Sequence, residues 1–226
     1  MSKKKRSKTK SKAKKSTSLA RRKKSTSLKL GEYFVTSEPI LDENDLIIPI
    51  EIREQMDAVY YLIQSDAKAA LSQLLDLIPQ YPDIPKLYNY LCAVYGKLGD
   101  EKRVDELVVE TYQRFPNYLF ARINYAESYI RQENYAKVAE IFDYKFDLKS
   151  LYPERTHFHI TEFMSFTFLI GRYFIGIGEM ERAQFVYSEM KQVDYGSAQT
   201  LSLGMLLMKD KGFRQQVLAK LFSLKK

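Results

Sequence analysis

A spacing of 34 residues recurs along the body of this chain and constrains its fold more than any other feature. Residues of one kind return at this spacing in five separate columns. The columns are Tyr61, Tyr95 and Tyr129; Ala58, Cys92 and Ala126; Ala70, Val104 and Val138; Leu74, Val108 and Phe142; and Pro82 with Pro116. Periods of roughly 20–50 residues are typical of folds that stack one supersecondary unit repeatedly. The spacing therefore predicts a repeat architecture.

Each period has the pattern of two helices joined by a turn. In the second unit, apolar residues follow helical spacing over residues 87–98, Gly99-Asp100 interrupts them, and the spacing resumes over 104–112. The first unit spans residues 49–78 and the third 119–142. A single hairpin of this kind cannot bury its apolar side, so the units are expected to stack on one another.

A fourth unit is out of step with the first three. Residues 170–187 repeat the order of the columns, but about eleven extra residues lie before them, within 144–162. Two further helices are expected after Asp194, the first capped by Ser197. The first helix of the fourth hairpin, over residues 158–175, is apolar on nearly every side. We expect it either to be buried against the C-terminal helices or to contact a partner or a second copy.

The second and third units resemble the tetratricopeptide repeat family. The residues that carry the resemblance are Tyr88, Leu91, Cys92, Tyr95, Gly99, Val104, Val108 and Pro116 in one unit, and Tyr125, Ala126, Tyr129, Val138 and Phe142 in the next. The chain departs from the family in having no Trp and in carrying Val104 where Ala is usual. The resemblance covers residues 51–194. It implies an all-α fold, a right-handed α-solenoid of about four tetratricopeptide-like hairpins plus C-terminal capping helices, over residues 49–226.

The resemblance also implies a concave groove, lined by the first helix of each hairpin, that binds a protein or peptide segment. The positions that line it are Lys86, Asn89, Ala93, Lys97, Phe120, Ile123, Asn124, Glu127 and Arg131. Family members that clamp a terminal carboxylate use Lys, Asn and Arg, and the matching Gln55 and Val59 of the first unit break that pattern. On the alternative reading, Lys86 and Lys97 are solvated charges on helix surfaces. The implied function is a non-enzymatic scaffold or chaperone-like adaptor.

The charge of the chain is divided sharply. Residues 1–30 hold fourteen Lys and Arg and no acid, whereas residues 31–226 hold 22 basic and 28 acidic residues. The tail has too few apolar side chains to offset the entropy of ordering, so residues 1–30 are expected to be a disordered basic tail. The cations most concentrated for binding a polyanion are Lys3, Lys4, Lys5, Arg6, Lys14, Lys15, Arg21, Arg22, Lys23 and Lys24.

Three roles are open for the tail. Nucleic acid is the first candidate partner, bound without sequence specificity and with strong salt dependence, which would make the protein a nucleic-acid- or ribosome-associated factor. An anionic membrane surface is the second. The third is a solubilising tail with no dedicated role. Clusters such as Arg21-Arg22-Lys23-Lys24 also resemble nuclear-import signals, which matter only in a eukaryote.

Residues 31–48 are too apolar for a plain linker and are expected to dock onto the solenoid. One form of this hypothesis places them across its groove. No stretch is long and apolar enough for a membrane span. A single cysteine, Cys92, fits a reducing compartment, so a cytoplasmic location is expected, or a nuclear one in a eukaryote. The oligomeric state is left open.

Catalytic chemistry has few candidates in this sequence. His157 and His159 are its only histidines, and they have Glu154 and Glu162 nearby. Two histidines do not form a metal site without further ligands, and Cys92 falls in a column of small residues, where burial is expected. No glycine-rich phosphate loop is present. We therefore expect no enzyme activity, no metal and no cofactor.

Overall fold

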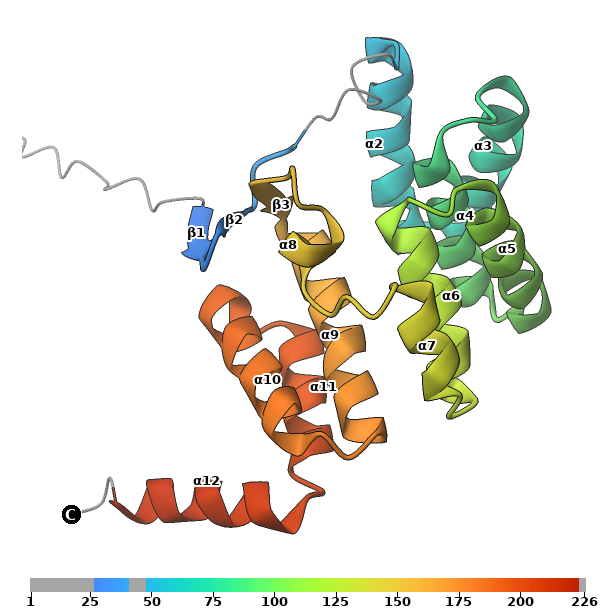
Figure 1. Cartoon of the computed structure of the whole chain (residues 1–226). Coiled ribbons are helices and arrows are strands. Elements are labelled where there is room, and N and C mark those ends of the chain that lie inside the picture. The colour runs from blue at the N-terminus through green and yellow to red at the C-terminus, as the bar shows by residue number, and fades with distance from the viewer. Residues whose placement is uncertain (1–26, 41–47, 224–226) are drawn as a thin grey trace, which may run out of the picture.

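The computed structural model describes residues 27–40 and 48–223 of the chain. Its helices stack as a solenoid of hairpins, and the predicted all-α class is confirmed (Figure 1). The hairpins are α2 (Ile50–Ser65) with α3 (Ala67–Gln80), α4 (Pro85–Leu98) with α5 (Glu101–Arg114), α6 (Leu119–Arg131) with α7 (Tyr135–Ile141), and α9 (Ile160–Gly176) with α10 (Met180–Asp194). The helices α11 (Ala198–Leu207) and α12 (Lys211–Ser223) follow.

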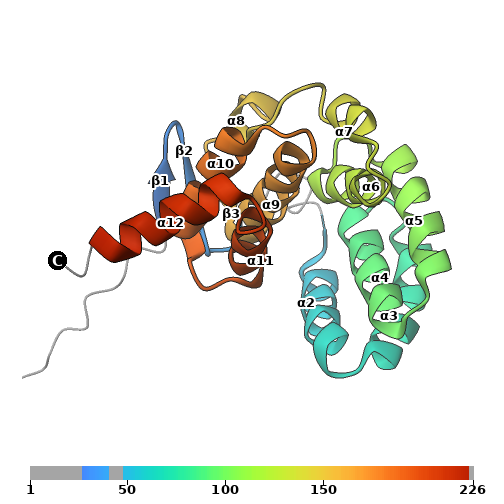
Figure 2. The same ribbon diagram turned by 90° about the horizontal axis from the view of Figure 1, so that it is seen from below.

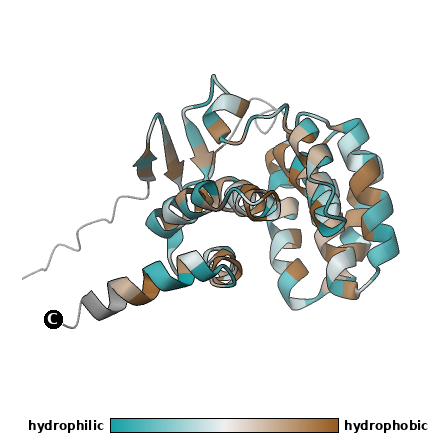
Figure 3. Cartoon of the chain, turned by 60° about the horizontal axis from the view of Figure 1, so that its bottom comes forward, coloured by the Kyte–Doolittle hydropathy of each residue, from teal (hydrophilic) through white to brown (hydrophobic). Residues whose placement is uncertain are grey.

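The first helices of the hairpins lie on the inside of a curve. Figure 2 shows α2, α4, α6, α9 and α11 on the inner side, with α3, α5, α7 and α10 outside them. Hydrophobic and hydrophilic segments alternate along most helices, as amphipathic packing requires (Figure 3). Helix α11 packs on α9 and α10, whereas α12 extends away from the stack. Among the described residues, no helix has the length and hydropathy to cross a membrane.

Three helix N-caps explain the 34-residue period. Asp66, Asp100 and Asn134 each accept a hydrogen bond at Oδ1 from the backbone N–H three residues later, at 3.0, 3.1 and 3.3 Å. Such caps satisfy one of the free donors at a helix start. The second helix of each of the first three hairpins therefore begins at the same point of the period.

The first helix of the first hairpin is rotated relative to that period. Gly99, Glu133 and Gly178 have positive φ and precede the N-caps of α5, α7 and α10, but the corresponding Ser65 remains helical. The connection between α2 and α3 is the single residue Asp66, whereas two residues connect α4 to α5 and three connect α6 to α7. In α2 Val59 is buried, while Tyr61 of the predicted tyrosine column is 72% exposed.

Ala58 of the small-residue column is also exposed, whereas Cys92 and Ala126 are buried as expected. The column assignment is therefore wrong in the first unit and holds in the second and third. It could not be corrected from spacing alone, because the missing residue lies in the turn.

The extra residues before the fourth hairpin form a short helix and a strand. Helix α7 ends after seven residues, and α8 (Leu148–Leu151) and β3 (His157–His159) follow. Strand β3 pairs in parallel with β2 (Tyr33–Thr36), which pairs antiparallel with β1 (Ser27–Leu30). This three-stranded sheet lies at the N-terminal end of α9 (Figure 1). It was not anticipated from the sequence.

The sheet corrects the expected boundary of the basic tail at residue 30. Ser27–Leu30 form a strand because their backbone groups pair with β2 and because Leu30 is buried in the core. Residues 1–26 lie outside the described part of the chain, so the expectation of disorder concerns them alone. Within residues 31–48, which were expected to dock onto the solenoid, Tyr33–Thr36 pair with β3 and pack on α9. Residues 41–47 lie outside the described part.

The buried side chains form two clusters. One joins α2, α3, α4 and α5, and the other joins the sheet to α6 through α11. Tyr125 of α6 packs against both clusters. In the second cluster α9 buries most of its apolar side chains, including Phe163, Phe166 and Leu169, so the expectation of burial for this helix is confirmed. Gly171 lets α9 approach Leu203 of α11, because an added Cβ would lie 2.6 Å from that side chain.

Candidate interaction face

The nine residues predicted to line a groove all lie on the inner helices α4 and α6 (Figure 2). Ala93 and Lys97 are exposed. Five others are half-buried, and they are Lys86, Asn89, Phe120, Asn124 and Glu127. We use the name inner face for these seven residues together with Tyr60 and Gln64 of α2 and Arg172 of α9, which lie beside them.

An amide pair connects the second and third hairpins at the centre of this face. The Nδ2 of Asn124 donates to the Oδ1 of Asn89 at 3.0 Å. A carboxamide has two N–H donors and a carbonyl acceptor. Among the described residues, the Nδ2 of Asn89 and the Oδ1 of Asn124 have no further hydrogen-bond partner. The pair therefore leaves one donor group and one acceptor group available, side by side.

Charged side chains join the other inner helices in the same way. Lys97 of α4 donates from Nζ to the Oε1 of Gln64 on α2 at 2.8 Å. Arg172 of α9 donates from one guanidinium nitrogen to both carboxylate oxygens of Glu127 on α6, at 2.5 and 2.6 Å. Every junction between the inner helices α2, α4, α6 and α9 thus carries a polar contact at the inner face.

Aromatic surface accompanies these polar contacts on the first two hairpins. The ring of Tyr60 is 48% exposed and lies 5.9 Å from the ring of Tyr90 on α4. The ammonium group of Lys86 lies 5.9 Å from the Tyr90 ring centroid, on the scale of a cation–π contact. The face therefore combines apolar area with hydrogen-bonding groups.

Two of the predicted groove residues do not contribute in the expected way. Ile123 is only 8% exposed and belongs to the core cluster of α6 and α9. Arg131 is exposed, but its guanidinium pairs at 3.1 Å with Asp105 of the outer helix α5. A side chain at the end of a helix can reach the neighbouring helix start, which spacing alone does not reveal.

The sequence reasoning missed three residues of the inner face. Tyr60 and Gln64 occupy the positions of Ala93 and Lys97 once the shorter turn after α2 is taken into account. Arg172 lies 45 residues after Glu127, because the insertion separates the third and fourth hairpins. The short Ser65-Asp66 turn, without a glycine, is the one signal that could have revealed the shift.

The two histidines and the cysteine have structural surroundings. Nδ1 of His159 accepts from the N–H of Thr161 at the start of α9, and His157 stacks on Phe34 with ring centroids 5.1 Å apart. Burial raises the pKa of the Cys92 thiol to about 12. Within the described residues, no group of three His, Cys, Asp or Glu side chains gathers as a metal site would require.

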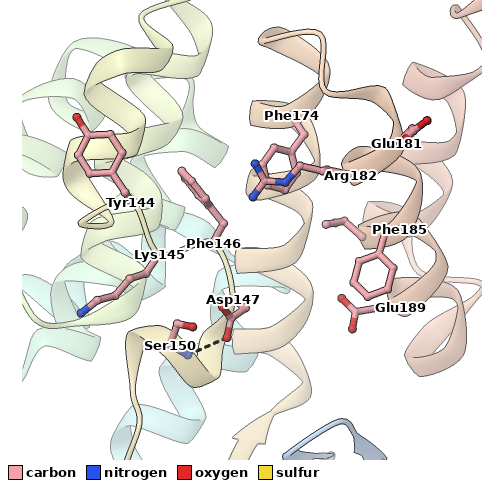
Figure 4. A pocket seen from close by; sticks show the side chains of 11 residues that line it. Tyr144, Lys145, Phe146, Asp147, Ser150, Phe174, Glu181, Arg182, Phe185 and Glu189 are labelled. Carbon is pink, nitrogen blue, oxygen red and sulfur yellow. Dashed lines mark hydrogen bonds between the residues drawn. The ribbon is translucent and has the colours of Figure 1, made fainter.

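A pocket of about 540 Å³ lies between the segment that follows α7 and the helices α9 and α10 (Figure 4). Phe146, Phe174 and Phe185 are among its lining residues, and the guanidinium of Arg182 lies 4.0 Å from the ring centroid of Phe174. Asp147 and Glu189 also line it. Burial, and to a smaller extent the charge of Asp147, raises the pKa of Glu189 above its ordinary value.

Comparison with models of known protein families and with curated protein sequences gives no significant match. Among solved structures, a point mutant of MamA is similar over 76% of this chain and 95% of its own, with 13% identity and a TM-score of 0.46. A thermophilic TPR protein of Thermus thermophilus is similar over 75% of this chain and 96% of its own, with 16% identity and a TM-score of 0.45. At these scores the fold assignment rests on the helical hairpins of this chain themselves.

Proposed function

We propose that this protein is a non-catalytic interaction scaffold that binds a segment of another protein on its inner face. The observation that carries the proposal is the amide pair Asn89–Asn124, which is half-buried and leaves a donor group and an acceptor group unused. A peptide group of a bound segment offers the complementary acceptor and donor. Hydrogen bonds to such a segment would fix its position without requiring a particular side chain.

The surroundings of the amide pair support the same role. Tyr60 and Ala93 offer exposed apolar surface beside it, and buried aromatic area is a common source of binding energy at protein interfaces. Lys97 and Arg172 offer further donors at the two sides of the pair. A bound segment could therefore contact several hairpins at once.

The surroundings of the two histidines and the cysteine support a non-catalytic role. His159 caps a helix, His157 stacks on an aromatic ring, and the Cys92 thiol is buried with a raised pKa. A nucleophile needs an adjacent base or a lowered pKa to be reactive. The Cys92 thiol, with its raised pKa, does not meet that requirement.

Substituting the amide pair tests the proposal. We expect full-length N89A/N124A to capture its protein partner from a lysate of the source cells about tenfold less efficiently than the unsubstituted chain, because two hydrogen bonds are lost. The matched control is Q73A/Q113A, which removes two exposed amides from the outer helices α3 and α5. Quantitative mass spectrometry of the captured proteins gives the readout. Equal capture by both double variants would contradict the proposal.

Association with nucleic acid through the basic tail is a second proposed function, carried by the concentration of fourteen cations and no acid in residues 1–30. Nuclease treatment in the same capture experiment separates the two functions. Partners held through nucleic acid are lost with nuclease, whereas partners held on the inner face are retained.

A further inference from the structure

The early end of α7 creates the pocket between the third and fourth hairpins. Helix α5 has 14 residues, but α7 stops after seven, and Asp143 and Tyr144 take positive φ angles that turn the chain away. The segment that follows runs to α8 instead of continuing the helix. The space of about 540 Å³ lies beside this segment, against α9 and α10.

One end of the pocket carries two carboxylates without a partner cation. Asp147 accepts a hydrogen bond at Oδ1 from the N–H of Ser150, and Glu189 is partly buried. Within residues 27–40 and 48–223, no Lys or Arg forms an ion pair with either carboxylate. Asp147 itself is exposed. Like charges close to one another are unfavourable, and a cation placed between them offsets that cost.

The lining of the pocket suits a long basic side chain. Phe146 and Phe185 lie on opposite sides of it, and Arg182 is held over Phe174 towards the other end (Figure 4). Lys and Arg bury their methylene stems on apolar surface while the charged end stays among polar groups. The aromatic walls offer such a surface, and the carboxylates offer the polar end.

The basic tail joins the body at the hairpin that borders this acidic end. Tyr33 of β2 lines a small adjoining cavity together with Asp147 and Glu189. The tail connects to this hairpin at Ser27, which pairs with Thr36, three residues from Tyr33 or about 10 Å along the strand. Residues 1–26 carry thirteen Lys and Arg and no acid, and Lys23 and Lys24 precede Ser27 by only four and three residues. A tethered segment of this kind reaches an effective concentration on the order of millimolar at a nearby site.

We propose that this pocket binds a basic side chain of the chain's own N-terminal tail, residues 1–26, with the cation between Asp147 and Glu189. The occupied pocket would hold the tail against the fourth hairpin. Polyanions would then compete with the pocket for the same cations. This inference does not depend on binding at the inner face, because the pocket lies on the outer side of α9.

Zero-length carbodiimide cross-linking of the full-length chain tests this proposal. An equal mixture of ¹⁴N- and ¹⁵N-labelled protein is cross-linked, and mass spectrometry identifies the joined residues. We expect intrachain links from tail lysines to Asp147 or Glu189 at least about five times as often as to Glu110, an exposed carboxylate on α5. In about 1 M NaCl, where charges are screened beyond about 3 Å, the preference should disappear.

A second measurement does not depend on how readily each carboxylate reacts with the carbodiimide. Tryptic cleavage within the tail should be several-fold faster in D147N/E189Q than in the unsubstituted chain, because the tail has lost its acidic site. The asparagine side chain introduced at position 147 can still cap α8, and Q73A/Q113A is again the control. Links that join Glu110 as often as Glu189, links found only between ¹⁴N and ¹⁵N chains, or equal cleavage rates would each overturn the proposal.

Discussion

Replacing Phe158 with alanine is expected to lower the free energy of unfolding by about 3–5 kcal/mol. Phe158 is the central residue of β3 and is fully buried. Its ring lies 5.2 Å from that of Tyr33 in an edge-to-face arrangement, and the guanidinium of Arg155 lies 4.4 Å from its centroid. Removing the ring leaves a cavity where the sheet meets α9. Urea denaturation followed by circular dichroism measures the effect.

Phe185→Ala is the matched control for this substitution. It removes the same side chain from a position on α10 that is 64% exposed, so the change in unfolding free energy should stay within about 0.5 kcal/mol. An equally small effect of Phe158→Ala would show that the β1–β2 hairpin and β3 do not pack on the fourth hairpin as described.

Replacing Leu74 with alanine is expected to cost about 2–5 kcal/mol and to weaken the first core cluster. Leu74 is fully buried in α3, and it shares this cluster with Cys92 of α4. The neighbouring Leu75 is 51% exposed and provides the control, Leu75→Ala. Urea denaturation gives the free energies of unfolding of both variants.

Labelling of Cys92 with a thiol reagent gives a second readout for the same pair. Cys92 is buried, and burial raises the pKa of its thiol to about 12, so labelling is expected to require opening of the cluster. At neutral pH the Leu74→Ala variant should therefore label at least about tenfold faster than the Leu75→Ala variant. Equal labelling rates would mean that Cys92 is exposed without opening of the cluster.

Most of the solenoid could be predicted because residues with strong effects on local structure recur at its 34-residue period. Asp66, Asp100 and Asn134 begin the second helices, and polar caps and turns are recognisable from sequence. The apolar stripes of α9 could be assigned to the core for a similar reason, since a helix that is apolar all round is normally buried.

The features that could not be predicted depend on single residues in turns or on contacts between distant segments. The turn between α2 and α3 is one residue shorter than the turn between α4 and α5, which places Tyr60 at the position of Ala93 on the inner face. Strand β3 forms because β2, more than 120 residues earlier, supplies its hydrogen-bonding partner. No local propensity specifies such a pairing.

The candidate site was predictable to the same extent as the helices that carry it. Asn89 and Asn124 follow from the period, and the structure brings them into contact at 3.0 Å. Ile123 was assigned to the same surface, but its side chain fills the core between α6 and α9. Helical spacing identifies the approximate face of a helix, and tertiary packing decides which of the border positions remain exposed.

Site-specific photo-cross-linking tests binding at the inner face most directly. A photoreactive phenylalanine derivative is introduced in place of Ala93, which is exposed at the centre of the inner face, or in place of Gln113 on the outer helix α5. Irradiation of source cells that express the full-length variants joins each site to whatever lies against it. We predict discrete protein adducts at position 93 that are absent at position 113. No adduct at position 93, or the same adducts at both positions, would contradict binding at the inner face.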